Sequence, residues 1–194
     1  MARQSGSSAT GEAVVRFIFE MRQLREEARH GWLRIGENPE SVAEHCQRAA
    51  CLGYLLARLE GFSDPNLVCA MVIFHDMAET RVGDVDLVQK RYVKADEKTA
   101  ALDQVRGLGA AGDDILRMLR EVDSGSSAAG IIAKDSEVLE MAFTARELIA
   151  RGNADAQEWM DAAGHRLRTR SAKRILGIVR NSDPARWWKE VCGI

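Results

Sequence analysis

The chain has 194 residues, of which 46% are hydrophobic, and it carries a formal net charge of -2 with acidic and basic residues interspersed. This length and composition suit one globular domain with a real core. The small net charge argues against a nucleic-acid or membrane-surface protein. No apolar run approaches the roughly 18–20 residues that a membrane-spanning helix needs, so we expect no membrane partner.

The four cysteines form no C-x-x-C pair, and three of them, Cys46, Cys51 and Cys69, lie inside apolar helical patterns. We therefore expect buried, reduced thiols and a cytoplasmic location. Residues 1–11 are rich in Ser, Gly and Ala and lack the apolar core of a signal peptide, which predicts a flexible N-terminal tail.

The first half of the chain shows three helical segments. The first lies near residues 11–28 and carries one apolar stripe, formed by Val14, Val15, Ile18, Phe19 and Leu24. An irregular loop follows at 29–40. A capping box at Ser41 and Glu44 starts a second helix that runs to about Leu59. Asp64 and Pro65 start a third.

The second half is also helical. A charge-mixed helix is predicted from about 93 to 108, ended by Gly107, Gly109 and Gly112, and a short helix follows near 113–122. A long helix near 128–150 carries Asp135 on its apolar side. Three more are predicted near 154–165, 169–181 and 184–191. No alternating strand pattern and no repeat is present, so the predicted class is all-α.

The third helix ends in an unusual group of polar residues. An apolar run from Leu67 to Phe74 leads directly into His75 and Asp76, with Glu79 one helical turn after His75. Such groups are costly to bury unless they are paired or bound to a metal. Gly83 permits an unusual backbone angle that turns Asp84 back toward the same place.

His45 and Asp135 are the natural partners of this group. With His75 and Asp76 they give two imidazoles and two carboxylates from three helices, and a helical bundle is a common place for such ligands to meet. Glu79 and Asp84 are then free to accept and donate protons at the site. The alternative is that each residue is an ordinary capped or salt-bridged polar group.

Two motifs carry a family resemblance: PESVAEH at 39–45 and HDMAETRVGD at 75–84, followed by Asp135. Together they resemble the H…HD…D signature of the HD-domain metal-dependent phosphohydrolases, and within them the 5′-deoxynucleotidase (YfbR-like) branch. The similarity spans about residues 29–143. It implies an HD-domain helical bundle over residues 12–152, with residues 153–194 forming C-terminal helices packed on the same domain.

The resemblance also implies an activity. A water bound to one divalent metal ion per chain would attack (deoxy)ribonucleoside 5′-monophosphates and release nucleoside and phosphate. Cobalt, manganese, zinc, iron and nickel all suit the ligands. A homodimer is implied too. The implied residues are the metal ligands His45, His75, Asp76 and Asp135, the catalytic acids Glu79 and Asp84, and the substrate-binding residues Arg29 and Trp32.

The substrate-binding residues leave alternatives open. Trp32 in its glycine-flanked loop is equally suited to fill the core. Arg29, or Arg34, suits a phosphate clamp or a solvated loop charge. Bacterial relatives carry an Arg directly before the Trp, where this chain has Gly31, so selection for 2′-deoxy sugars stays open.

Other functions compete with this one. The nearest is an HD phosphohydrolase for another phosphoester, such as nucleoside triphosphates or cyclic nucleotides. A dinuclear oxygenase or phosphodiesterase would need more histidines than His30 and His165, the two that remain. A non-catalytic helical protein with a structural metal would have no need of the spare carboxylates of Glu79 and Asp84.

Overall fold

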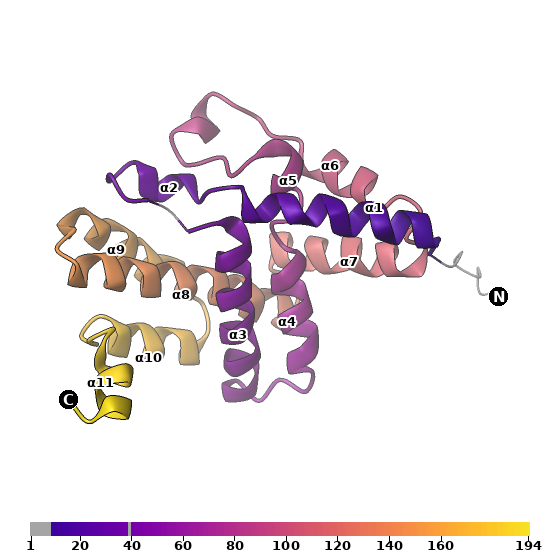
Figure 1. Cartoon of the computed structure of the whole chain (residues 1–194). Coiled ribbons are helices and arrows are strands. Elements are labelled where there is room, and N and C mark those ends of the chain that lie inside the picture. The colour runs from indigo at the N-terminus through magenta and orange to yellow at the C-terminus, as the bar shows by residue number, and fades with distance from the viewer. Residues whose placement is uncertain (1–8, 39) are drawn as a thin grey trace.

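The computed structural model describes residues 9–38 and 40–194 (Figure 1). Most of the predicted N-terminal tail, and Pro39 of the first motif, lie outside these residues. The described part is all-α, as predicted, and its only β feature is an isolated bridge between Ala28 and Ser41. The helices in chain order are α1 (Gly11–Met21), α2 (His30–Leu33), α3 (Val42–Leu59), α4 (Pro65–Phe74), α5 (Glu79–Val82), α6 (Glu97–Gln104), α7 (Ala110–Ser124), α8 (Ala128–Ala150), α9 (Gln157–Arg166), α10 (Arg170–Val179) and α11 (Arg186–Cys192).

Local capping fixes where the main helices begin. The Ser41 hydroxyl accepts from the Glu44 backbone N–H at 3.2 Å, and the Glu44 carboxylate accepts from the Ser41 N–H at 2.7 Å. Asp64 accepts from the Leu67 N–H at 3.0 Å, with Pro65 as the first residue of α4. These bonds satisfy backbone donors that a helix start leaves unpaired, so the predicted starts of α3 and α4 are confirmed.

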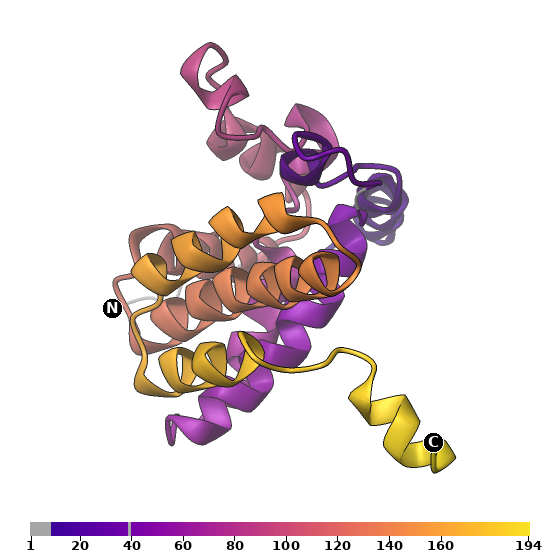
Figure 2. The same cartoon turned by 90° about the vertical axis from the view of Figure 1, so that its left-hand side faces the viewer.

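Helix α8 lies at the centre of the molecule. Its buried residues, which include Ile132, Val138, Leu139 and Ala142, lie on more than one side of the helix, as in a helix surrounded by others. Helices α3 and α4 lie side by side and cross α8 (Figure 1), while α9 and α10 lie along its two flanks (Figure 2). Where they cross, each of the helices α3, α4 and α8 contacts the other two.

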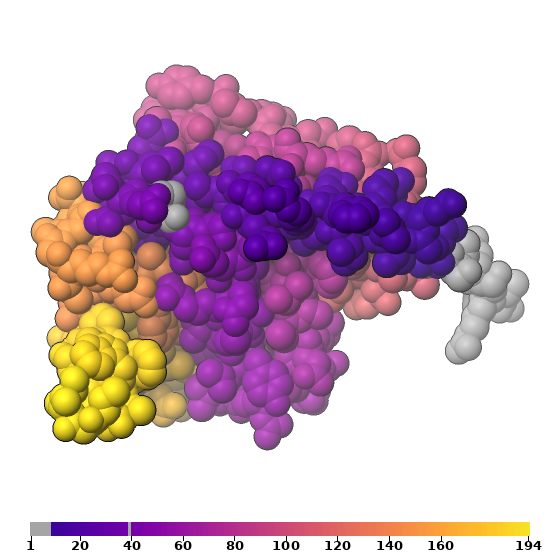
Figure 3. Space-filling model, viewed as in Figure 1, coloured from indigo at the N-terminus to yellow at the C-terminus, as the bar shows by residue number. Residues whose placement is uncertain are grey.

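Helix α1 differs from its prediction. It ends at Met21, and a 3₁₀ turn (Arg22–Arg25) follows in place of a helix to residue 28. Of the predicted apolar stripe, Val14, Val15, Ile18 and Phe19 are exposed, Phe19 by 75%, and only Leu24 is buried, whereas Phe17, which was not part of the stripe, lies in the core. The helix runs across the outside of the bundle (Figure 3), so only a narrow side contacts the core.

Gly107 and Gly112, both predicted to end the helix near residues 93–108, differ from that prediction. Helix α6 ends before Gly107, at Gln104, so it is shorter than predicted. Gly112 lies inside α7, where an added Cβ would come within 3.0 Å of the Val105 carbonyl oxygen. The prediction at Gly112 was therefore wrong, because this glycine permits a close approach of backbones rather than ending a helix.

The cysteines and the C-terminus complete the fold. Cys46 is buried, but Cys69 is half-buried and Cys51 is exposed, which corrects the expectation that all three lie in the core. Helix α11 stands apart from the α8–α10 layer (Figure 2), and Trp187 is 69% exposed there. Among the described residues, no helix is both long and apolar enough to cross a membrane.

Candidate metal centre

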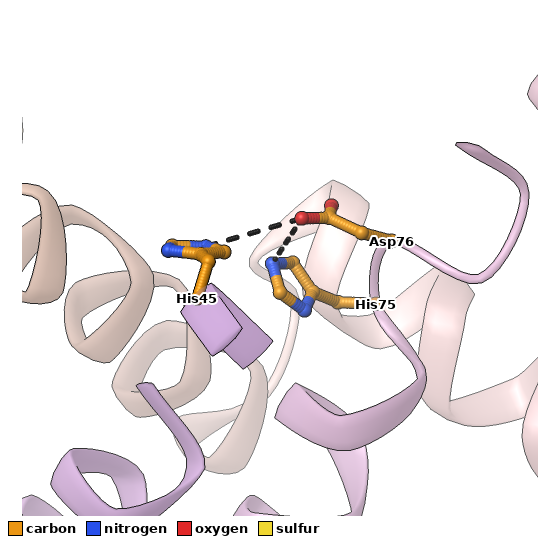
Figure 4. A group of neighbouring side chains, drawn as sticks. All are labelled: His45, His75 and Asp76. Atoms are coloured by element: carbon orange, nitrogen blue, oxygen red, sulfur yellow. Dashed lines mark ion pairs between the residues drawn. The ribbon is translucent and has the colours of Figure 1, made fainter. Parts of the chain in front are cut away.

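Three of the four expected ligands come together. His45 extends from the first turn of α3, and His75 and Asp76 follow the last turn of α4 (Figure 4). The Asp76 Oδ2 atom lies 3.0 Å from His75 Nε2 and 3.9 Å from His45 Nε2. One ligand atom from each residue falls within 4.8 Å of the others, a spacing suited to a single ion.

The two imidazoles are held so that the same nitrogen of each faces this point. His75 Nδ1 lies 2.6 Å from the Val72 carbonyl oxygen, to which it donates, and His45 Nδ1 contacts the Glu140 carboxylate. Both Nε2 atoms and Asp76 Oδ2 are buried without a hydrogen-bond partner. Buried polar atoms without partners need an explanation, and a divalent metal ion supplies one that fits this donor set.

The charges of the cluster are strongly coupled. Burial opposes ionisation of Asp76, but the positive groups of His75 and Arg29 hold the pKa of this carboxyl well below its usual range. Burial, with the negative charges of Asp76 and Asp84, raises the pKa of Glu79 to about 9. Without a metal, Glu79 is therefore a protonated acid at neutral pH, beside an ionised Asp76.

Asp84 and Arg29 lie at the same site. Gly83 adopts a φ of 77°, a left-handed value that favours glycine, and the chain then turns at Asp84. Asp84 Oδ2 accepts from the His30 backbone N–H at 2.9 Å. Arg29 Nη1 lies 3.6 Å from Asp76 Oδ2 and 3.7 Å from Asp84 Oδ2, so its guanidinium bridges the metal cluster and the second acid.

The structure does not bring Asp135, the fourth expected ligand, into this group, and its role as a metal ligand stays a prediction. Its carboxylate accepts from the backbone N–H groups of Arg168, at 2.9 Å, and Thr169, at 2.6 Å, and from the Thr169 hydroxyl at 2.6 Å. These bonds hold the start of α10 against α8. Asp135 is buried because it has this structural partner.

Glu137 on α8 is a buried acidic group whose charge interacts with those of His75 and Asp76. Its Oε2 atom is buried without a hydrogen-bond partner, although Lys134 Nζ forms an ion pair with it at 2.7 Å. Burial opposes its ionisation, yet Lys134 and His75 lower the pKa of Glu137. Glu137 and Glu140 stand three residues apart and so share one face of α8, which was the signal available in the sequence.

Glu140 was also missed by the sequence reasoning. It is fully buried, and one carboxylate oxygen contacts His45 while the other accepts from Arg48 Nε at 2.7 Å and from the Thr144 hydroxyl at 3.1 Å. Burial opposes its ionisation, but His45 and Arg48 hold the pKa of Glu140 below its usual value. Arg48 also pairs with Glu147 at 2.9 Å.

The remaining expected residue, Trp32, lies in the core. It is 3% exposed, and its ring centroid lies 5.3 Å from that of Trp159. This is the placement of the core-filling alternative, and a substrate-wall role for Trp32 stays a prediction. Two further cations lie at the cluster: Lys134, and Arg166 with its Nη2 atom 3.9 Å from Glu137 Oε1.

Comparison with known proteins places this geometry in context. The sequence model of the HD domain family matches residues 21–177, a span that contains every residue of the cluster. The 5′-deoxynucleotidase HDDC2 of Dictyostelium discoideum is 29% identical over 136 residues, covering 64% of this chain and 72% of that protein. The 5′-deoxynucleotidase hdd1 of Schizosaccharomyces pombe is 27% identical over 148 residues, covering 70% of this chain and 72% of that protein. A crystal structure of a Pyrococcus horikoshii protein is similar over 86% of this chain and 98% of its own, with a TM-score of 0.71 and 27% identity.

Proposed function

Because this chain belongs to the HD-domain family of phosphohydrolases, we propose that it is a metal-dependent phosphomonoesterase acting on (deoxy)ribonucleoside 5′-monophosphates. The observation that carries the proposal is the buried group of His45 Nε2, His75 Nε2 and Asp76 Oδ2 without partners, beside Glu79 and Asp84. The similarity to proteins named 5′-deoxynucleotidase supports the substrate class.

His45, His75 and Asp76 would hold one divalent ion, and Glu137 on α8 is a candidate for a further ligand because its Oε2 atom is also buried without a hydrogen-bond partner. Imidazole and carboxylate ligands suit manganese, iron, cobalt, nickel and zinc alike. When bound, such an ion supplies Lewis acidity toward the phosphoryl group and lowers the pKa of water.

The chain's own cations would bind the phosphate. Arg29 is mostly buried, with its guanidinium between Asp76 and Asp84, and its forked N–H groups match phosphate oxygens. Lys134 and Arg166 add positive charge around Glu137. A dianionic monophosphate is attracted to such a group of cations, which favours substrates with a terminal phosphate.

Two acids beside the proposed ligands, Glu79 and Asp84, would move the protons. Hydrolysis breaks the bond between phosphorus and the 5′ oxygen, so the attacking water must lose a proton and the leaving oxygen must gain one. Glu79, which lies in the same buried group of acids, is suited to donate to the leaving oxygen. Asp84, held by Arg29 and by the His30 N–H, is suited to accept from water.

The test is metal-dependent phosphate release. The purified protein is stripped of metal, restored with cobalt, manganese or zinc singly, and assayed on deoxy and ribo monophosphates, triphosphates and cyclic nucleotides. We expect release from monophosphates in at least one metal, and a loss of about 100-fold or more in Asp84→Ala. No release from any monophosphate would overturn the proposal. Equal release from ribo and deoxy substrates would remove only the sugar preference.

The proposal includes a homodimer, as the family resemblance implies. Light scattering during size-exclusion chromatography is expected to give a mass near twice the 21.5 kDa of one chain. A mass that stays at one chain across the concentrations used for the assay would contradict this part and leave the chemistry in place.

A further inference from the structure

We propose that Glu140, oriented by Arg48, is a positioning residue that keeps the Nδ1 atom of His45 protonated and its Nε2 atom free for the metal. This inference rests on the proposed function only in taking His45 Nε2 as a metal ligand. It concerns a residue outside the group of His45, His75 and Asp76, and one that acts through His45.

The contacts around His45 leave it one hydrogen-bond partner. His45 and Glu140 are both fully buried, and the Glu140 Oε2 atom contacts His45 Nδ1. On the other side of the ring, His45 Nε2 has no hydrogen-bond partner, and Asp76 Oδ2 lies 3.9 Å away. The orientation of the imidazole is therefore set from the Nδ1 side.

A carboxylate fixes the tautomer of a neutral imidazole. An ionised Glu has only acceptor atoms, so the ring nitrogen that faces it must carry the proton. A neutral imidazole has one N–H, and the other nitrogen then keeps its lone pair for a metal. Partners of this kind orient metal ligands in many proteins, and losing one typically weakens metal binding by about 10- to 100-fold.

Arg48 restricts the orientation of the side chain at position 140. It lies on α3 three residues after His45, and its Nε donates to Glu140 Oε1 at 2.7 Å. A guanidinium has only donors, so the atom of residue 140 that faces it must be an acceptor. With Arg48 in place, a carboxamide at 140 must turn its oxygen to Arg48 and its NH₂ group to His45.

This constraint makes Glu140→Gln informative although it barely changes the size of the side chain. The NH₂ group would require His45 Nδ1 to accept, which moves the proton to Nε2 and blocks the metal. In Arg48→Met/Glu140→Gln the amide is free to rotate and to offer its oxygen to Nδ1 again. The Thr144 hydroxyl adapts in both cases, because it can donate or accept.

The experiment measures cobalt affinity by isothermal titration calorimetry for the wild type, Glu140→Gln, the double variant and Glu147→Gln. The last is the matched control, since Glu147 pairs with Arg48 at 2.9 Å and is not a contact of His45. We expect Glu140→Gln to bind about 10- to 100-fold more weakly, Glu147→Gln to match the wild type, and the double variant to recover part of the loss.

A second measurement needs no metal. Nitrogen-15 NMR of histidine-labelled, metal-free protein at alkaline pH distinguishes the two neutral tautomers, and we expect His45 to carry its proton on Nδ1 in the wild type and on Nε2 in Glu140→Gln. Unchanged cobalt affinity in Glu140→Gln, or an unchanged tautomer, would overturn the inference. A double variant no better than Glu140→Gln would overturn the role of Arg48. A wild type that binds no cobalt would refute the metal site, while the NMR result would still decide the tautomer.

Discussion

At the scale of single residues, the site is built from acids that differ mainly in their surroundings. Asp76 stays ionised because His75 and Arg29 offset the cost of its burial. Glu79, three residues later, is pushed toward its neutral form by the same burial and by the charges of Asp76 and Asp84. The Asp135 carboxylate instead accepts hydrogen bonds from the backbone N–H groups of Arg168 and Thr169. The same functional group is thus ionised at Asp76, favours its neutral form at Glu79 and caps the start of a helix at Asp135.

The raised pKa of Glu79 has a consequence for stability. Because its pKa rises from 4.5 to about 9 on folding, the native metal-free protein holds a proton that the unfolded chain releases between these values. The free energy of unfolding contributed by this group therefore falls as pH rises from about 4.5 toward about 9. Urea unfolding across this range is expected to show a shallower fall in Glu79→Gln. An identical slope in Glu79→Gln and the wild type would contradict the prediction, and a Glu158→Gln change on the exposed side of α9 provides the control.

Asp135 and Glu137 form a matched pair for assigning the ligand on α8. Glu137→Gln is expected to weaken cobalt binding by about 10-fold or more, with little change in the stability of the metal-free protein. Asp135→Asn is expected to leave cobalt affinity near the wild-type value. It should lower the free energy of unfolding by about 1–3 kcal/mol, because hydrogen bonds to a charged acceptor are weakened. Calorimetric titration and urea unfolding of both variants check this, and the opposite pattern would restore Asp135 as the ligand.

At the scale of helices, α8 organises both the fold and the site. It directs Asp135 to the start of α10 and Glu140 to His45, and it pairs Glu137 with Lys134, while its apolar residues contribute to the core. A helix with neighbours on several sides can serve several partners at once. Its position along its own axis must therefore be fixed tightly, and the contact with α7 at Gly130 contributes to this.

Gly130 permits the close approach of α7 and α8. A Cβ atom there would lie 2.2 Å from the Glu121 carbonyl oxygen, which belongs to backbone and cannot move aside cheaply. Gly130→Ala is therefore expected to lower the free energy of unfolding by about 1–3 kcal/mol, measured by urea denaturation. Gly177→Ala in α10, where a Cβ meets nothing within 4 Å, is expected to be neutral or to stabilise by up to about 1 kcal/mol. Equal effects of the two changes would refute the steric explanation.

Those features that depend on neighbouring residues were predictable from the sequence, and those that depend on tertiary packing were not. Ser41 and Asp64 mark their helix starts because a cap and its donors lie within three residues of each other. The face of α1 that contacts the core depends on helices distant in the sequence, so the apolar stripe predicted the wrong buried face for this helix. Asp135 and Glu137 both sit on a helix with neighbours on several sides, and only the position of α10 separates their roles.

At the scale of the whole molecule, the candidate metal centre joins elements far apart in the sequence. His45 comes from α3, and His75 and Asp76 follow α4, so a bound ion would cross-link two helices. The unfolded chain does not hold these groups together. The free energy of metal binding would therefore add to the stability of the folded protein.

Metal addition is accordingly expected to raise the melting temperature. Cobalt at 100 times its dissociation constant should add about 2.7 kcal/mol to the free energy of unfolding, and chelation should reverse the shift. Differential scanning calorimetry with and without cobalt measures this. Asp76→Asn, which replaces the carboxylate beside both histidines by a neutral amide, should show a much smaller cobalt-dependent shift. A shift of the same size in that variant would place the stabilising ion elsewhere.

The contrast between the two sets of tryptophans gives the protein a built-in optical probe. Trp32 and Trp159 stack within the fold, next to the segment that carries Arg29, whereas Trp187 is 69% exposed and Trp188 is 39% exposed on α11. Emission from the C-terminal pair should be red-shifted and accessible to iodide, and emission from the inner pair should be shielded. Replacing Trp187 and Trp188 by Phe would leave a fluorescence signal from Trp32 and Trp159 alone. A change in that signal when a nucleoside monophosphate is added would then report the proposed binding near Arg29 without any added label.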